Sequence, residues 1–124
     1  MNVVDQAHGE NWSLYLGDAT EVLQGLPDNS VDFSCYSPPF LILYAYSASD
    51  RDLGNSHNPA LFWQHFSFIS QQLYRLTKPG RIMAVHVAQL VTTKTYHGEI
   101  GLQDFRGDTI RHFKKDFSQL TVAI

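Results

Sequence analysis

The sequence has little cysteine and no long apolar run, and both absences restrict where the protein can work. Its one cysteine, Cys35, cannot form a disulfide within the chain, which fits a reducing compartment. The stretch 1–12 lacks the apolar segment of a secretory signal peptide, and no stretch approaches the roughly 20 apolar residues that a membrane span requires. We therefore expect a cytoplasmic protein that makes no contact with a membrane.

Charge is scarce as well. Charged residues make up 17% of the chain, the net charge is −3, and the lysines and arginines form no run. No overall field draws such a chain to nucleic acid, so a DNA-binding role would need a local basic patch. The histidines show no pair with metal-ligand spacing, so no metal is expected. The low charged share suggests that part of the surface contacts further chain or a partner subunit.

What the sequence does contain is a regular alternation of strands and helices. Apolar patterns predict strands at 12–16, 31–36, 81–88 and 120–124, with helices between them and loops at 41–57 and 89–106. Strands that alternate with helices favour a mostly parallel sheet with helices on its faces. The fold class expected is therefore α/β, a partial Rossmann-like fold within one domain. In such folds ligands bind beyond the carboxyl ends of the strands.

The helix signals are local and specific. Asp18 and Glu21 have the spacing of a capping box before a short helix at 19–24. Asn58 followed by proline predicts the start of a longer helix, and Asp108 is expected to cap the last one. The long helix carries an apolar stripe, and its aromatic residues are predicted to be core: they are Phe62, Phe66 and Phe68.

One tetrapeptide carries candidate chemistry, Ser37-Pro38-Pro39-Phe40, which follows the strand at 31–36. We call it the Ser37–Phe40 motif. Proline has no amide hydrogen, so strand pairing must stop there, and a Pro-Pro pair after a strand is most often only a terminator. However, a hydroxyl and a proline carbonyl at a strand end can accept hydrogen bonds from an amine, and an adjacent aromatic ring can stack on a base.

The motif and its surroundings resemble one enzyme family. The segment 29–40 resembles the catalytic motif of DNA methyltransferases that modify cytosine N4 or adenine N6, in which Asp, Asn or Ser precedes Pro-Pro and then Tyr or Phe. Further segments resemble the same family in the same order, and the last is common in phage and prophage members. They are Gly17-Asp18 with Glu21-Val22-Leu23, then 26–30, 51–55, 75–81 and 100–108.

The resemblance implies roles for the motif. Ser37 and the carbonyl of Pro38 would accept hydrogen bonds from the target amine, Pro39 completes the motif, and Phe40 would stack on a base turned out of double-stranded DNA. Serine in the first position leans toward cytosine N4. The methyl donor would be S-adenosylmethionine, with Asp18 and Ser37 beside it. Capping of the first helix is an equally good role for Asp18.

Residues after the motif are expected on the substrate side. Tyr44 and Tyr46 would contact DNA or stay as solvated loop aromatics, and Asn55 belongs to the segment that resembles a substrate loop. Cys35 lies inside the strand and is predicted to be a buried structural thiol instead of a nucleophile.

One family feature is missing. Related enzymes carry a glycine-rich cofactor loop C-terminal to the motif and a target recognition region, and the sequence contains neither. We therefore expect residues 1–124 to be the N-terminal, motif-bearing half of a methyltransferase domain. The alternative is a non-catalytic remnant that folds and associates with itself without methylating. A truncated open sheet would expose an edge, so a homo-oligomer is expected, most simply a dimer.

Overall fold

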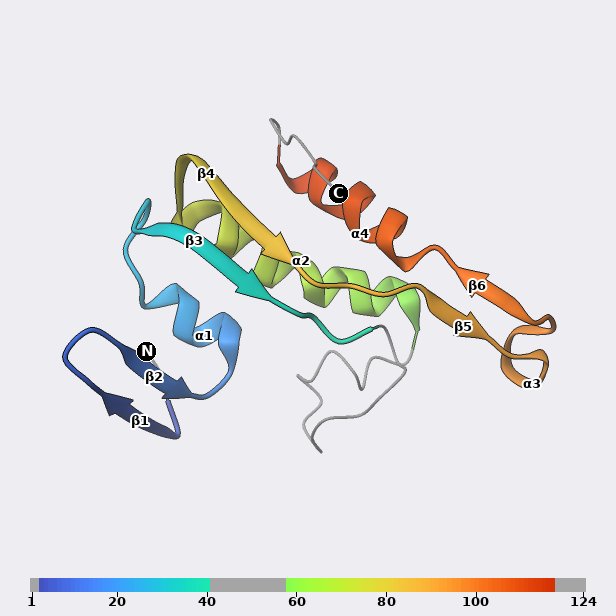
Figure 1. Ribbon diagram of the computed structural model, residues 1–124, viewed down its shortest axis with the longest axis horizontal. Helices are drawn as coiled ribbons and strands as arrows, with labels where there is room; N and C mark the ends of the chain where they lie inside the picture. Colours follow the sequence, from blue (N-terminus) through green and yellow to red (C-terminus); the bar gives the residue numbers. More distant parts are fainter. Residues whose placement is uncertain (1–2, 41–57, 118–124) are drawn as a thin grey trace. The chain divides into compact units, whose positions relative to one another are not determined.

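The computed structural model describes residues 3–40 and 58–117 of the chain (Figure 1). Its elements are β1 (Asp5–His8), β2 (Ser13–Leu16), α1 (Ala19–Gln24), β3 (Val31–Tyr36), α2 (Pro59–Leu76), β4 (Thr77–Val85), β5 (Leu90–Thr92), α3 (Lys94–His97), β6 (Gly101–Gln103) and α4 (Phe105–Asp116). The chain divides into two compact units. The first comprises 1–34 with 68–83, and the second 35–67 with 84–124.

The first unit begins with a hairpin. β1 and β2 pair in antiparallel register, with Asp5 opposite Leu16 and His8 opposite Ser13. The strand predicted at 12–16 is confirmed as β2, but its partner β1 was not predicted because 5–8 has no apolar alternation. Pairing is decided instead by the tight turn, in which the Gly9 amide donates to the Trp12 carbonyl at 2.9 Å.

The short helix α1 forms where the capping signal placed it. The Asp18 carboxylate accepts hydrogen bonds from the amides of Thr20, at 2.9 Å, and Glu21, at 3.4 Å. At the other end Gly25 donates back to the carbonyl of Val22 at 3.1 Å and ends the helix. The two bonds to Asp18 satisfy amides that the first turn of a helix leaves unbonded.

A single arginine ties the turn after α1 to the end of α2. The guanidinium of Arg75 donates to the carbonyls of Leu23 and Leu26, both at 2.9 Å, and pairs with the carboxylate of Asp28. The carbonyl of Arg75 in turn accepts from the Asn29 amide at 3.0 Å. The planar guanidinium presents several fixed donors, which is why one side chain can serve these acceptors and also Gln72, whose side-chain oxygen accepts from Nε at 2.9 Å.

β3 and β4 pair and run in the same direction (Figure 1). β3 has the predicted bounds, whereas β4 starts directly after α2, so the strand predicted at 81–88 was placed too late. Gly80 has a φ of 74°, a left-handed conformation that glycine adopts without strain. Across the pair, the carboxylate of Asp32 faces Lys78 at 2.7 Å and Arg81 at 3.3 Å.

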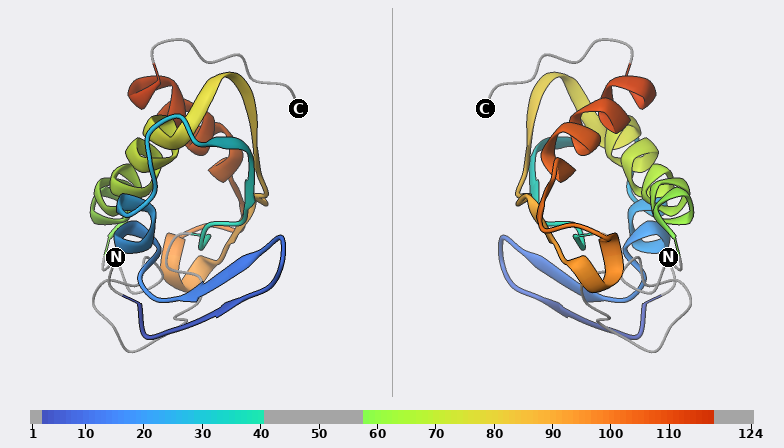
Figure 2. Two further views of the ribbon diagram at one scale, coloured as in Figure 1. Left: turned by 90° about the vertical axis from the view of Figure 1, so that its left-hand side faces the viewer. Right: turned by 90° about the vertical axis from the view of Figure 1, so that its right-hand side faces the viewer.

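The core of the second unit is aromatic. Asn58 caps α2 as predicted, through the Leu61 amide at 2.8 Å. α4 lies beside the N-terminal part of α2 in both Figure 1 and Figure 2, with ring centroids of Phe66 and Phe113 5.6 Å apart. The buried aromatic residues are Phe62, Phe66, Phe105, Phe113 and Phe117. Phe68 was wrongly predicted as core; it is 52% exposed because it lies two residues past Phe66, on another side of α2.

The stretch 89–106, predicted to be a loop, contains the hairpin of β5 and β6 with the short helix α3 at its tip. Its strands have only three residues each, too few for a clear alternating pattern. The cap of the last helix was also misplaced: Asp104 caps α4, and Asp108 lies in its first turn. The strand predicted at 120–124 lies outside the described residues.

The α/β class is confirmed, and the sheet prediction is confirmed only in part. Within 3–40 and 58–117 the strands form three separate pairs, and β1–β2 and β5–β6 are antiparallel because short connections join them. A larger parallel sheet is not formed by these residues. No helix among them is long and apolar enough to cross a membrane.

Arg75 should dominate the stability of the first unit. Arg75→Lys keeps the charge but not the fork of donors, so it cannot bond the Leu23 and Leu26 carbonyls and the Asp28 carboxylate together, and it should lower the free energy of unfolding by about 1–3 kcal/mol in urea titrations. The matched control is Arg111→Lys on α4, whose exposed pair with Asp108 should contribute about 0–1 kcal/mol. Equal losses in the two variants would contradict the role of Arg75.

Candidate active site

The Ser37–Phe40 motif begins where the β3–β4 pair ends. At this end of the pair the His86 amide donates to the Tyr36 carbonyl, at 2.9 Å. Pro38 and Pro39 follow and have no amide hydrogen to continue the ladder. Pro38 is buried and Ser37 is exposed, so the motif is anchored at its second residue and presents its first to solvent.

Ser37 lies against His86. The Ser37 Oγ atom is 3.1 Å from Nδ1 of His86 and 3.2 Å from its backbone carbonyl oxygen. This contact is exposed, so the pair is open to a ligand. Ser37 and His86 follow the neighbouring strands β3 and β4, so they meet although they are far apart in the sequence. Ligand-binding residues of open α/β sheets meet at strand ends in the same way.

Phe40 is held between two rings. Its centroid is 6.0 Å from that of His86 and 5.8 Å from that of Phe105. Phe105 is fully buried and contacts Phe62 at 6.1 Å and Trp63 at 5.6 Å, so Phe40 rests on the aromatic core of the second unit. Phe40 itself is half-buried, which suits a ring that supports a ligand from one side.

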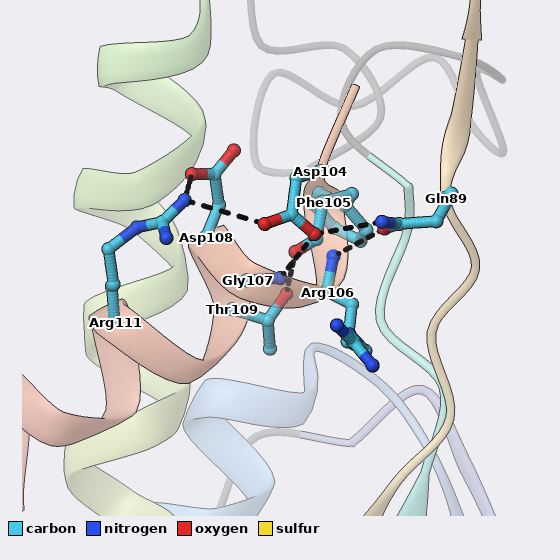
Figure 3. A network of polar contacts seen from close by, with 8 residues as sticks. All are labelled: Gln89, Asp104, Phe105, Arg106, Gly107, Asp108, Thr109 and Arg111. Carbon is cyan, nitrogen blue, oxygen red and sulfur yellow. Dashed lines mark hydrogen bonds and ion pairs between the residues drawn. The ribbon is translucent and has the colours of Figure 1, made fainter. Parts of the chain in front are cut away.

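Phe105 is the first residue of α4, and a polar network fixes the start of that helix (Figure 3). The Asp104 carboxylate accepts from the Gln89 side chain at 2.8 Å and from the Gly107 amide at 3.1 Å, and the Gln89 oxygen accepts from the Arg106 amide at 3.0 Å. A Cβ at position 107 would overlap the Asp104 carboxylate, so any larger residue there would have to displace this cap. The hydrogen bond from Gln89, then that from Gly107, lowers the pKa of Asp104.

Tyr36, the residue before the motif, has a buried phenol oxygen with no hydrogen-bond partner among the described residues. Burial raises the pKa of the Tyr36 phenol well above its usual value. This side chain is therefore neutral at physiological pH and does not serve as a general base.

The other predicted site residues have mixed outcomes. Asp18 caps α1 in the first unit, whereas the motif belongs to the second, so its contact with a cofactor stays a prediction. Tyr44, Tyr46 and Asn55 lie outside the described residues.

Cys35 was wrongly predicted to be buried: it is exposed, because alternate residues of β3 point to opposite sides and this one points outward. No cluster of metal-ligating side chains occurs in the part of the chain that the structure describes.

The sequence analysis gave no role to two site residues, His86 and Phe105, although 86–89 was expected at a strand end of the kind where ligands bind. His86 stood inside a predicted strand that in fact ends at Val85, and its partner is 49 positions away. Phe105 lay in a predicted loop. Its position directly after an aspartate, at a helix start, was the available signal.

Comparison with known proteins places the fold. No family model and no curated protein matches the sequence. Three crystal structures of one protein of Thermus thermophilus, provisionally assigned as a DNA modification methylase, are similar to this chain. The selenomethionine derivative has a TM-score of 0.60 at 21% identity, and its match covers 80% of this chain and 35% of the other. A second structure of the same protein gives 0.59 at 23% identity, covering 80% and 37%.

The third structure is that protein complexed with S-adenosyl-L-methionine, with a TM-score of 0.61 at 23% identity and coverage of 80% and 37%. The chain thus spans little more than a third of the protein that it resembles. Likeness at this identity shows a shared fold. The described elements are a mixed α/β arrangement similar to part of a methylase fold.

The Asp104 network predicts a pH-dependent stability. Since the folded-state pKa of Asp104 is lowered, its stabilisation is fully present above the ordinary aspartate pKa of about 3.9 and is lost as pH falls through the folded value. Asp104→Asn should therefore lower the urea midpoint near neutral pH and approach the wild type in acid. Gln89→Leu removes the main cause of the shift and should shrink this dependence. A constant difference between Asp104→Asn and wild type across pH would contradict the assignment.

Proposed function

We propose that this chain is the motif-bearing part of a DNA methyltransferase that transfers a methyl group from S-adenosylmethionine to the exocyclic amine of cytosine or adenine. One observation carries the proposal: the Ser37–Phe40 motif stands at the end of β3, with Ser37 exposed and Phe40 packed on the buried ring of Phe105. The fold supports it, since the similar protein has been crystallised with S-adenosyl-L-methionine and carries the methylase assignment.

The residues present suit chemistry at an amine. The lone pair of such a nitrogen is conjugated into the ring of the base, so acceptors must draw its hydrogens out of the ring plane. Ser37 Oγ and the carbonyl of Pro38 are two acceptors one residue apart, and proline restricts the backbone between them. Phe40 would stack on the base after its extrusion from the duplex, which is worth about 1–3 kcal/mol.

The cofactor would supply an electrophilic methyl group when bound. Asp18 remains the candidate for contact with it, because a carboxylate has about four acceptor positions and helix capping does not by itself exclude a second role. Ser37 would lie near the transferred methyl group, since it holds the amine that receives it. Serine in the first motif position favours cytosine N4 as the target, and double-stranded DNA is the substrate.

A second candidate is a folded remnant that methylates nothing. It is favoured by the charged share of only 17% and by the lack of a run of lysines and arginines. Calorimetry with S-adenosylmethionine separates the two candidates. Heat of binding and thermal stabilisation support the enzyme, whereas neither effect at millimolar cofactor supports the remnant.

Substitution of Ser37 tests the proposed chemistry directly. Ser37→Ala removes one acceptor and should lower the rate of tritiated methyl transfer to unmethylated DNA by about 10- to 1,000-fold. The matched control is Ser30→Ala, which removes a hydroxyl that donates to Pro27 in a turn of the first unit and should leave the rate unchanged. A wild-type rate in Ser37→Ala would contradict the assigned role.

We also propose self-association as a dimer. Leu14 and Leu16 on β2 are 64% and 63% exposed, and Ile82 on β4 is 70% exposed, so large apolar side chains of the first unit are available to a partner. Light scattering at tens of micromolar should give twice the monomer mass, and Leu14→Lys with Leu16→Lys should reduce it toward the monomer. A monomeric wild-type mass would contradict this proposal.

A further inference from the structure

The contact between Ser37 and His86 has two possible arrangements of hydrogens, and they can be distinguished by counting donors. The Ser37 hydroxyl has one hydrogen and lies 3.1 Å from Nδ1 of His86 and 3.2 Å from its carbonyl oxygen. A carbonyl oxygen only accepts, so the hydroxyl must be the donor of that bond. If the hydroxyl pointed at Nδ1 instead, its oxygen would face the carbonyl oxygen with no hydrogen between them.

Both contacts become hydrogen bonds in only one arrangement. The hydroxyl donates to the carbonyl of His86, and Nδ1 of the same residue carries a hydrogen that it donates to Ser37 Oγ. Resting on the proposed function, we propose that His86 is a positioning residue: it orients the Ser37 hydroxyl so that one lone pair of Oγ is left to accept a hydrogen bond from the target amine.

The consequence for the reaction is preorganisation. A serine hydroxyl normally rotates and can meet an amine either as a donor or as an acceptor. Here its hydrogen is committed to a backbone carbonyl, and one of its two lone pairs to Nδ1, so it meets the amine only as an acceptor. No reorientation is then needed when the base arrives, which is the condition under which fixed polar groups contribute most to rate.

His86 has a second contact that the test must control for. Its ring lies 6.0 Å from that of Phe40, so removal of the ring would also disturb the stacking residue. Two substitutions separate these roles. His86→Phe keeps a ring beside Phe40 but has no side-chain donor, whereas His86→Asn places an amide NH₂ near the position of Nδ1 but has no ring. The backbone carbonyl of residue 86 is retained in both.

Nitrogen-15 NMR of the histidine side chains decides the arrangement without any activity measurement. In mildly alkaline buffer His86 should carry its hydrogen on Nδ1, and Ser37→Ala should return it toward the Nε2 form. Ser13→Ala is the matched control, because Ser13 contacts Nδ1 of His8 at 2.9 Å and should leave the His86 signals unchanged. A hydrogen on Nε2 of wild-type His86, with Nδ1 bare, would overturn the assignment.

Methyl-transfer kinetics then test its consequence. His86→Phe should lower kcat about 10- to 100-fold with a smaller change in the KM for DNA, and His86→Asn should recover most of the loss. An equal loss in both variants would overturn the positioning role. The two proposals fail separately: a wild-type chain with the Nδ1 hydrogen that transfers no methyl group contradicts the proposed function, while the proton arrangement at Ser37 still stands.

Discussion

The organisation of the candidate site depends on two prolines that have no amide hydrogens. β3 and β4 pair up to the bond between Tyr36 and His86, and beyond it Pro38 and Pro39 offer nothing for a further ladder bond. Polar groups beyond this point must therefore find hydrogen-bond partners outside the strand ladder. The Ser37 hydroxyl uses the neighbouring His86 for this purpose, so the end of the strand pair becomes the place where side chains from two distant segments meet.

Support for the site comes from apolar packing that begins at a polar cap. Asp104 fixes the first turn of α4, which places Phe105 in the aromatic core, and Phe105 in turn supports Phe40. Under the proposed function, the Phe40 ring would contribute more to stacking because its position is already fixed, whereas ordering a free side chain would offset the gain. The position of Phe40 in the site thus depends on the buried ring of Phe105 and, through it, on the Asp104 cap.

Much of the local structure could be predicted from the sequence because local contacts decide it. The helix α1 is bounded by Asp18 and Gly25, whose side-chain and backbone bonds lie within a few residues, and both ends are confirmed. The start of α2 at Asn58 and the end of β3 before the prolines follow from equally short-range chemistry. The cap of α4 was misplaced because Asp104 and Asp108 have the same side chain, so local chemistry cannot distinguish them. The surroundings of the helix start determine that Asp104 is the cap.

The sequence by itself determined the motif, the α/β class and the resemblance on which the proposed function rests. Only the tertiary structure decided which groups surround the motif. Ser37 and His86 are 49 residues apart, and their meeting follows from strand pairing, which no local pattern encodes. The same holds for the exposure of Cys35 and for Arg75, whose partners lie as many as 52 residues away. Strand periodicity predicts that successive side chains point to opposite faces. Which of the two faces is buried depends on other elements that pack against the strand.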